Sequence, residues 1–165
     1  MEKEFIELFK GYEGDFGMAD MSNPPIDADK NKIKPNYEWA GRPVTDTDYR
    51  DHLIGKKSIG IQPCRIDGTA QFGCIDIDPP DYGTFKVENY LALFQQYKLP
   101  LVPIFSKSGG LHCYIFLTEP IPTIDLIEAL KAFLLPLGLK PTTEVFPKQK
   151  ELQKDDKGDI KPGNF

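Results

Sequence analysis

Several features that would assign a protein to a familiar class are missing from this sequence. The net charge is −5 at pH 7, so a generally basic nucleic-acid coat protein is excluded, and nucleic acid would have to be held by a local patch, a metal or another part of an assembly. The three cysteines lie far apart without a C-x-x-C pair, so we expect buried apolar residues in a reducing compartment rather than zinc ligands. No apolar run reaches spanning length and the N-terminus is charged rather than signal-like, so we expect a cytoplasmic protein.

What remains is the composition of one globular domain. The 165 residues are 40% hydrophobic and 27% charged, which is sufficient for a sizeable core, and 15 prolines with 14 glycines indicate many turns. Residues 14–34 are expected to form a long irregular loop. Apolar periodicity predicts helices over residues 4–12, 85–97 and 124–135, and strands over residues 58–64, 71–78, 101–105, 111–117 and 142–146. A capping threonine, acids in the first turn and a closing glycine predict a further helix over residues 45–55. We expect the first two of these strands to pair as an antiparallel hairpin.

The most informative stretch covers residues 71–81, in which a predicted strand ends in two carboxylates and two prolines. Because side chains alternate along a strand, Asp76 and Asp78 point to one face, and Ile75 and Ile77 point into the opposite layer. Two like charges on one face are unfavourable unless they are screened, and a hard divalent ion with oxygen ligands is the usual partner. The stretch therefore predicts a metal site at a strand end. A solvated strand end that leads into a turn is the alternative.

A second informative stretch covers residues 105–117. Ser106, Lys107 and Ser108 precede two glycines, and their hydroxyls, backbone N–H groups and single cation could cradle a phosphate. In the strand that follows, His112 is a polar residue at the start of a mostly apolar segment. Such a histidine is commonly a hydrogen-bonded structural residue. Beside the paired carboxylates and the Ser/Lys/Gly turn, we interpret it instead as a ligand of a nucleotide phosphate.

A third acidic residue follows in the strand predicted over residues 142–146. Glu144 is either another metal ligand or a solvent-facing strand residue, and the sequence favours neither. Lys148 lies just beyond this strand, and residues 150–161 are charged and flexible in composition.

Taken in this order, the motifs resemble those of the archaeo-eukaryotic primase superfamily, most closely the primase-polymerase domains of TOTE conflict systems and of CRISPR-associated prim-pols. The resemblance covers roughly residues 5–165, and its specificity lies in the ordered combination, since each motif alone is weak. The similar segments are Asp76-x-Asp78, Ser108-Gly-Gly-Leu-His112, Glu144-x-Phe-Pro-Lys-Gln149 and Gly163-Asn164-Phe165, preceded by Arg42-Pro-Val-Thr45, Asp51-His-Leu and Ser58-Ile-Gly-Ile61.

The resemblance implies an α+β fold with an RRM-like catalytic core, in which helices cover one face of a mainly antiparallel sheet. The expected order of hairpin, helix, hairpin, helix and strand agrees with it. Residues 1–165 would form one primase-polymerase domain, with a helical and loop segment over residues 1–57 and the catalytic core over residues 58–165. The catalytic domains of this family are expected to continue past Gly163-Asn164-Phe165, so we expect the chain to be part of a larger enzyme.

The activity that the resemblance implies is template-directed nucleotidyl transfer, as a DNA primase or DNA polymerase. Asp76, Asp78 and Glu144 would hold two Mg²⁺ or Mn²⁺ ions about 3.5–4 Å apart. The triphosphate of the incoming nucleotide would be held by Ser106, Lys107, Ser108, His112 and Lys148. The implied partners are nucleoside triphosphates, a single-stranded or primed DNA template, and helicase or nuclease modules of the same system.

The sequence departs from the family pattern at two points. The small-x-His triplet of the second motif reads Gly110-Leu111-His112 and lacks a serine at its first position, so Ser106 or Ser108 would provide a hydroxyl. The third motif usually carries an aspartate, whereas the candidate here is Glu144. Two other classes stay open. Asp76-x-Asp78 also fits the D-x-D of a metal-dependent glycosyltransferase, and the domain could be a non-catalytic nucleic-acid-binding module.

Overall fold

The computed structural model of the chain describes residues 2–20, 26–27, 32–33, 37–78, 86–106, 110–156, 158–161 and 163. The helices in these ranges are α1 (Glu2–Leu8), α2 (Asp46–Leu53), α3 (Val87–Gln96) and α4 (Thr123–Leu134). The strands are β1 (Gly17–Asp20), β2 (Ile26–Asp27), β3 (Lys32–Ile33), β4 (Glu38–Trp39), β5 (Lys57–Gly60), β6 (Thr69–Ile77), β7 (Val102–Phe105), β8 (Leu111–Pro122) and β9 (Glu144–Phe146).

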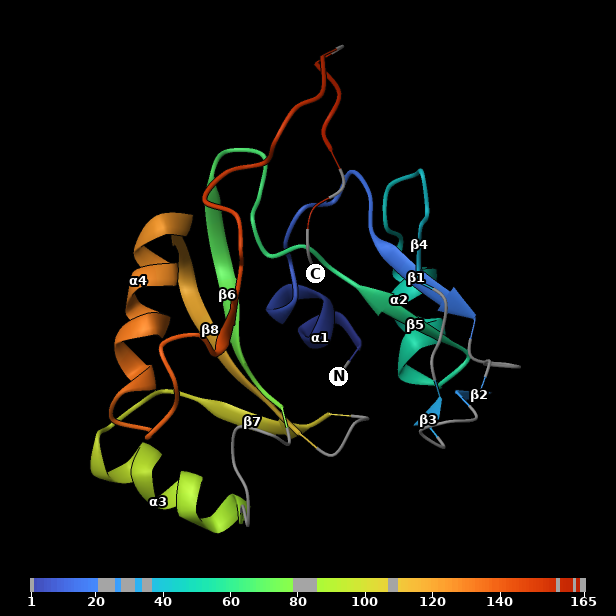
Figure 1. Ribbon diagram of the computed structural model, residues 1–165. Coiled ribbons are helices and arrows are strands. Elements are labelled where there is room, and N and C mark those ends of the chain that lie inside the picture. The colour runs from blue at the N-terminus through green and yellow to red at the C-terminus, as the bar shows by residue number, and fades with distance from the viewer. Residues whose placement is uncertain are drawn as a thin grey trace.

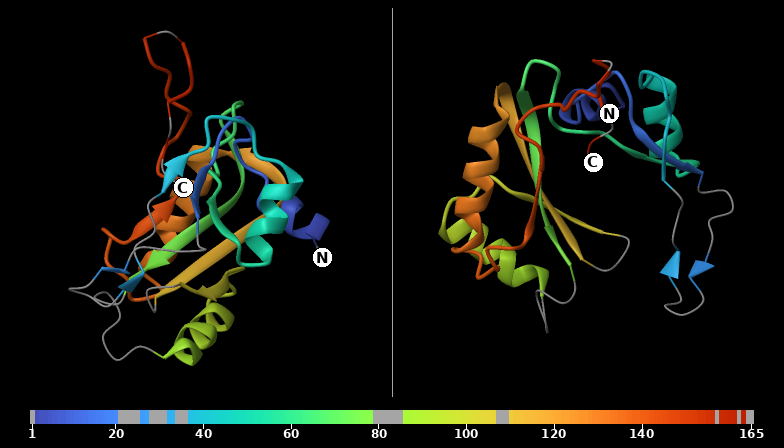
Figure 2. Two further views of the ribbon diagram at one scale, coloured as in Figure 1. Left: turned by 90° about the vertical axis from the view of Figure 1, so that its right-hand side faces the viewer. Right: turned by 45° about the horizontal axis from the view of Figure 1, so that its top comes forward.

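The strands form two main antiparallel sheets that lie in different halves of the molecule (Figure 1). The C-terminal sheet has the order β7-β8-β6-β9, and the N-terminal sheet has the order β4-β1-β5. Strands β2 and β3 pair only with each other in the described part of the chain. Helices α3 and α4 lie on the outer side of the C-terminal sheet, whereas α1 lies between the two sheets (Figures 1 and 2). The α+β fold, with helices on one face of an antiparallel sheet, is therefore confirmed.

The core lies between the C-terminal sheet and the two helices that cover it. Ile75 and Ile77 of β6 have no exposed surface and pack in one cluster with residues of β8, α3 and α4, as the alternation of side chains predicts. Gly73 of the same strand permits the close approach of α4, because a Cβ at this position would lie 2.8 Å from Leu130 Cδ1 and 2.8 Å from the carbonyl oxygen of Phe146. The apolar layer thus holds β6 in place, and the other face of this strand points towards the space between the two halves.

The N-terminal half is organised around a buried aspartate at the start of α2. Asp48 is 2% exposed, and its carboxylate accepts hydrogen bonds from the backbone N–H of Thr45 at 2.9 Å and from its hydroxyl at 2.7 Å. Arg42 donates two hydrogen bonds of 2.8 Å to the same carboxylate, and Lys57 Nζ lies 3.0 Å from Oδ1. The helix predicted from Thr45 is confirmed, and the ion pairs connect it to β5.

Two expectations about the first half of the chain are wrong. The strand that contains Ser58 does not form a hairpin with β6; β5 pairs with β1 instead, while the partners of β6 are β8 and β9. Residues 14–34 are not a loop throughout, because β1 lies at the centre of the N-terminal sheet. The alternative pairing arises because Gly17–Asp20 supplies backbone hydrogen bonds to both β4 and β5, and β5 ends at Gly60, so the chain crosses to β6 without strand structure.

Candidate active site

Three adjacent strands place three candidate site residues in one row. Asp76 of β6 lies directly opposite His112 of β8 on one side and Glu144 of β9 on the other. Residues that are directly opposite in an antiparallel pair project from the same face of the sheet. The sheet therefore brings together residues that are far apart in the sequence, on the face opposite α3 and α4.

The side chains of this row make two polar contacts. His112 Nε2 lies 3.5 Å from Asp76 Oδ1, and Lys148 Nζ lies 2.9 Å from Glu144 Oε1. The Lys148 ammonium also lies 4.8 Å above the centre of the Phe146 ring. Asp78 follows the end of β6 and is exposed. The row thus has carboxylates at its centre, with a histidine at one flank and an ion pair at the other.

The electrostatic environment of Asp76 is unfavourable for its charged form. Burial raises the pKa of this carboxyl above its usual value, the interaction with His112 lowers it, and the carboxylates of Asp78 and Glu144 raise it further. The net direction is upward. A divalent cation would relieve this repulsion, because it would compensate several carboxylates at once.

The second nitrogen of His112 faces a tyrosine. The hydroxyl of Tyr114 lies 3.5 Å from His112 Nδ1, and the two rings are nearly perpendicular, with centroids 6.0 Å apart. Burial raises the pKa of the Tyr114 hydroxyl, so this group stays protonated and can either donate to Nδ1 or accept from it. The Asp76 carboxylate only accepts, so it favours a hydrogen on Nε2.

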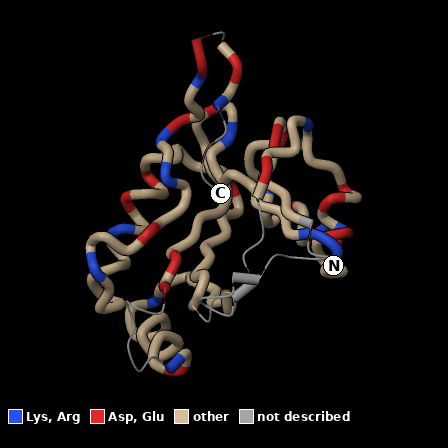
Figure 3. Tube along the Cα trace, turned by 45° about the vertical axis from the view of Figure 1, so that its right-hand side comes forward, with Lys and Arg blue, Asp and Glu red and all other residues tan. Residues whose placement is uncertain are grey.

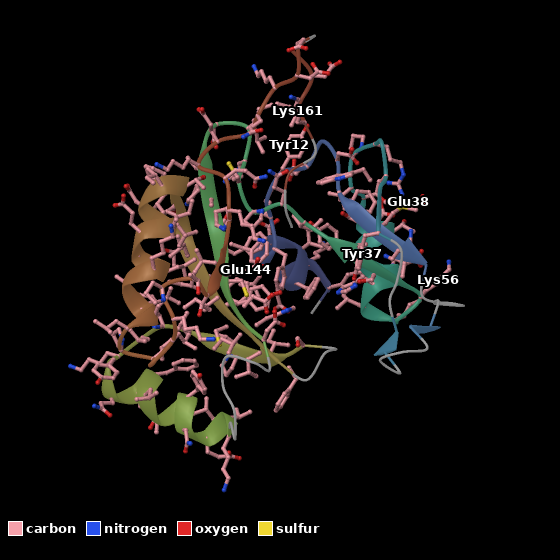
Figure 4. The ribbon with its side chains drawn as sticks, viewed as in Figure 1. Tyr12, Tyr37, Glu38, Lys56, Glu144 and Lys161 are labelled. Carbon is pink, nitrogen blue, oxygen red and sulfur yellow. The ribbon has the colours of Figure 1, made fainter. Side chains whose placement is uncertain are left out.

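The row opens onto a cavity of about 710 Å³ between the two halves of the molecule. The C-terminal sheet contributes one wall and the residues around α2 and β5 contribute the other; in Figure 4, Glu144 and Tyr37 mark the two facing halves. Phe9, from the segment that follows α1, packs edge-on against Phe72 and Tyr114 at the sheet surface, with ring centroids 5.3 and 5.2 Å apart. The lining residues are Phe5, Phe9, Tyr37, Tyr49, His52, Ser58, Ile59, Gly60, Ile61, Pro63, Phe72, Cys74, Asp76, Asp78, Ile104, Phe105, Ser106, His112, Tyr114 and Phe146.

Within the described ranges, no lysine or arginine lines this cavity. Basic and acidic residues are interspersed along the trace of both halves and do not form a continuous basic stripe in the part of the chain that Figure 3 draws in colour. Lys57 lies close to the cavity wall, but its ammonium is paired with Asp48 and Asp51. The cavity therefore combines an acidic edge with aromatic and neutral polar surfaces.

Of the other predicted site residues, the structure describes Ser106 but not Lys107 or Ser108. Ser106 lines the cavity, and its hydroxyl accepts a hydrogen bond of 2.9 Å from the backbone N–H of Gly110. A Cβ on Gly110 would collide with the carbonyl oxygen of Ile77, so the glycine permits the turn to approach the end of β6. Lys107 and Ser108 lie outside the described residues, as do Asn164 and Phe165 of the last motif.

The donor set suits a hard divalent cation, but the side chains are not gathered around a single point. Carboxylate oxygens are the ligands that Mg²⁺ and Mn²⁺ prefer, and Asp76, Asp78 and Glu144 are the candidates. In the ranges that the structure describes, no three His, Cys, Asp or Glu residues form a group that could hold a metal ion. The three cysteines are free and buried, as predicted.

Three cavity residues from the N-terminal half were not identified from the sequence. They are Tyr37, His52 and Ser58, and the hydroxyls of Tyr37 and Ser58 are hydrogen-bonded at 2.8 Å. The chain has only two histidines, and both line the cavity. That scarcity was one available signal for His52, and both His52 and Ser58 lie in segments that resemble the family, although neither residue was assigned to the site.

The protein is thus an α+β domain whose candidate site is an acidic row on the sheet face opposite α3 and α4, with a histidine on the neighbouring strand. The chain matches the family of the archaeo-eukaryotic primase domain of TOTE conflict systems over residues 18–160. It therefore belongs to that family, and so to the primase-polymerase superfamily. None of the curated proteins compared with it matches. No helix in the described residues has the length and apolar character needed to cross a membrane.

Proposed function

We propose that this domain catalyses template-directed nucleotidyl transfer to a 3′-hydroxyl, as a primase or polymerase, with divalent metal ions. The observation that carries the proposal is the position of Asp76. This carboxylate lies between His112 and Glu144 at the edge of the cavity, and its pKa is raised by burial and by two further carboxylates. Such an arrangement is costly for folding and is typical of a site that binds a cation. Membership of the primase family supports the same activity.

Asp76 and Asp78 would hold the metal ions, with Glu144 as the third carboxylate once Lys148 releases it. When bound, two such ions supply activation of the attacking hydroxyl and neutralisation of the pyrophosphate that leaves. In the reaction, the 3′-oxygen forms a bond to the α-phosphorus, and the bond from that phosphorus to the bridging oxygen of pyrophosphate breaks. Single-stranded or primed DNA would provide the template.

His112 would bind the triphosphate. The Nε2–H that now lies 3.5 Å from Asp76 is a donor, and phosphate oxygens are acceptors. The hydroxyl of Tyr114 contacts the opposite nitrogen and so helps to orient the ring. Ser106, beside the end of β6, and Lys148 would contribute further donors to the phosphates, together with Lys107 and Ser108.

The proposal is tested by removal of the two carboxylate charges. We expect the double variant Asp76→Asn, Asp78→Asn to lose Mn²⁺-dependent binding of dATP or ATP in calorimetric titration. We also expect template-dependent nucleotide incorporation to fall by about a thousandfold or more, because a transition state with high negative charge loses its cations.

A matched control is Glu128→Gln, which neutralises an exposed carboxylate of α4 on the outer side of the sheet. This variant should bind nucleotide and incorporate it as the unchanged protein does. Full incorporation by a folded Asp76→Asn, Asp78→Asn variant would refute the proposed function. Metal-dependent turnover of a sugar nucleotide in place of templated incorporation would indicate a glycosyltransferase instead.

A further inference from the structure

The two histidines of this chain line the same cavity from opposite walls. His112 belongs to β8 of the C-terminal sheet, whereas His52 belongs to the last turn of α2 in the N-terminal half. Nothing in the proposed reaction uses His52. In the described ranges the cavity has no lysine or arginine, so the histidines are its most versatile polar groups.

The ring of His52 is held in one orientation by two contacts. Its Nδ1 lies 3.3 Å from the backbone carbonyl oxygen of Lys57, and its ring lies 6.0 Å from that of Phe5 at an angle of 33°. Lys57 is the first residue of β5 and pairs with Asp20 of β1, so the carbonyl belongs to a sheet. The histidine is therefore attached to the rigid part of the N-terminal half.

This hydrogen bond determines which kind of ligand His52 can bind. A carbonyl oxygen only accepts, so Nδ1 must carry the hydrogen that it donates. In the neutral imidazole, Nε2 is then an acceptor. A phosphate oxygen is also an acceptor and is a poor partner for this nitrogen, whereas a hydroxyl group is a suitable donor. His52 thus differs from His112, whose Nε2 lies beside the Asp76 carboxylate.

The surroundings of His52 favour the sugar end of a nucleotide over a nucleic-acid backbone. Tyr37 and Ser58 add neutral hydroxyls to the same wall, and Phe5 and Phe9 add flat apolar surface. Nucleic-acid strands are held largely through lysine and arginine contacts to their phosphates, and the described lining of the cavity has none. A sugar and base, by contrast, need hydroxyl partners and apolar area.

We propose that His52 Nε2 accepts a hydrogen bond from a sugar hydroxyl of a nucleoside triphosphate whose phosphates lie at Asp76 and His112. The N-terminal half then recognises the nucleoside, and the C-terminal sheet recognises the phosphates and metal. This inference rests on the proposed function, because it requires that the phosphates occupy the acidic row. The two halves of the molecule would thus bind different parts of the same nucleotide.

The test compares two ligands and one variant. In His52→Asn, the amide nitrogen replaces Nδ1 as donor to the Lys57 carbonyl, while the acceptor at Nε2 is removed. We expect calorimetric titration in Mn²⁺ to show about fivefold to tenfold weaker binding of ATP, which is the usual effect of one lost hydrogen bond. Binding of inorganic tripolyphosphate should not change. In His52→Gln, the side-chain amide lies near the position of Nε2 instead, and its oxygen can accept the hydrogen bond. This variant should therefore recover part of the affinity for ATP.

Nucleotide analogues identify the hydroxyl. The ratio of affinities between the unchanged protein and His52→Asn should be the same for ATP and dATP if the 3′-hydroxyl is bound, and it should fall to one for the 2′,3′-dideoxy analogue. If the penalty of the variant persists with the dideoxy analogue, the proposed hydroxyl contact is wrong. Equal losses for ATP and tripolyphosphate would assign His52 to the phosphates and would also overturn it.

The outcomes separate the inference from the proposed function. If the unchanged protein binds both ligands in Mn²⁺ and His52→Asn binds both equally well, only the role of His52 is refuted. If the unchanged protein binds neither ligand, the proposed function fails together with the inference. Circular dichroism of His52→Asn should match that of the unchanged protein, since the contact with Lys57 is retained.

Discussion

Two carboxylates, one in each half of the molecule, have opposite electrostatic surroundings. Asp48 is almost fully buried, and the hydrogen bonds from Arg42 are the main cause that holds the pKa of its carboxyl well below the usual value of 3.8. Asp76 is 23% exposed in its side chain, and its pKa is raised instead, mainly by burial. The more deeply buried carboxylate is therefore the better stabilised one.

The difference arises from the partners that each half supplies. Around Asp48, three side chains donate hydrogen bonds or carry positive charge, namely Thr45, Arg42 and Lys57. Around Asp76, His112 and Lys148 lower the pKa, but burial and the two further carboxylates raise it, and the net direction is upward. A compensated buried charge indicates a role in folding, whereas an incompletely compensated one at a cavity indicates a role in binding. Burial alone would have ranked the two residues in the wrong order as candidates for the site.

The largest effect on stability is expected from Asp48→Asn. The variant leaves Arg42 and Lys57 beside a neutral amide, and we expect the free energy of unfolding to fall by about 2–4 kcal/mol. The figure lies in the lower part of the range for broken buried pairs because the Arg42 side chain is 45% exposed and can be rehydrated. Chemical denaturation measures the change. Asp46→Asn, at an exposed position of the same helix, is the control, and equal effects of the two variants would refute the distinction drawn for Asp48.

A smaller effect of opposite sign is expected from Asp76→Asn. The amide removes a desolvated charge that is repelled by Asp78 and Glu144, so the free energy of unfolding in metal-free buffer should rise by about 0.5–1 kcal/mol. Thermal or denaturant unfolding in EDTA measures it. A clear loss of stability would show that the Asp76 carboxylate is compensated in the folded protein, contrary to the comparison with Asp48.

The smallest effect is the pH dependence of the stability differences between the unchanged protein and each of the two variants, Asp48→Asn and Asp76→Asn. A carboxyl whose pKa is lowered by folding contributes stability above its unfolded pKa, and the contribution is lost as the pH falls through the folded pKa. For a raised pKa, the charged form is penalised as the pH rises through the folded pKa, and no penalty remains below the unfolded value. Both carboxyls have a usual value of 3.8.

We therefore expect Asp76→Asn to approach the unchanged protein in stability as the pH falls from 7 to this value, whereas Asp48→Asn should approach it only as the pH falls below this value. Asp48→Asn should approach it from below, and Asp76→Asn from above. Denaturation midpoints measured from pH 7 down to pH 2 give the curve for Asp76→Asn and the start of the curve for Asp48→Asn. A gain for Asp76→Asn that grows in acid would contradict the direction assigned to its pKa.

The sequence predicted most of the C-terminal half because its signals are local. The alternation in β6, the apolar stripes of α3 and α4, and the proline and glycine that follow α4 all act within a few residues. The error at β5 has a different origin. Strand pairing depends on which other segments of the chain are available as partners. β1, a short strand in a glycine-rich region, pairs with both β4 and β5, so β5 does not pair with β6.

The candidate site residues also differ in whether a local pattern in the sequence identifies them. Asp76 and His112 were predicted as site residues because each breaks an apolar strand pattern, and the antiparallel register places them side by side on one face of the sheet. His52 could not be found in this manner, since it lies on a polar helix where a histidine is unremarkable. Its proximity to the site results from the packing of the two halves, which no local pattern in the sequence encodes.

The absence of lysine and arginine from the described lining of the cavity has a consequence for how ligand affinity depends on ions. Proteins that hold polyanions with basic side chains release condensed counterions, so their affinity falls steeply as monovalent salt rises. The carboxylates in the described lining have no such release to gain. Nucleotide affinity here should follow the concentration of free divalent cation and fall only slightly with potassium chloride, since just two lysines, Lys107 and Lys148, are proposed to contact the phosphates.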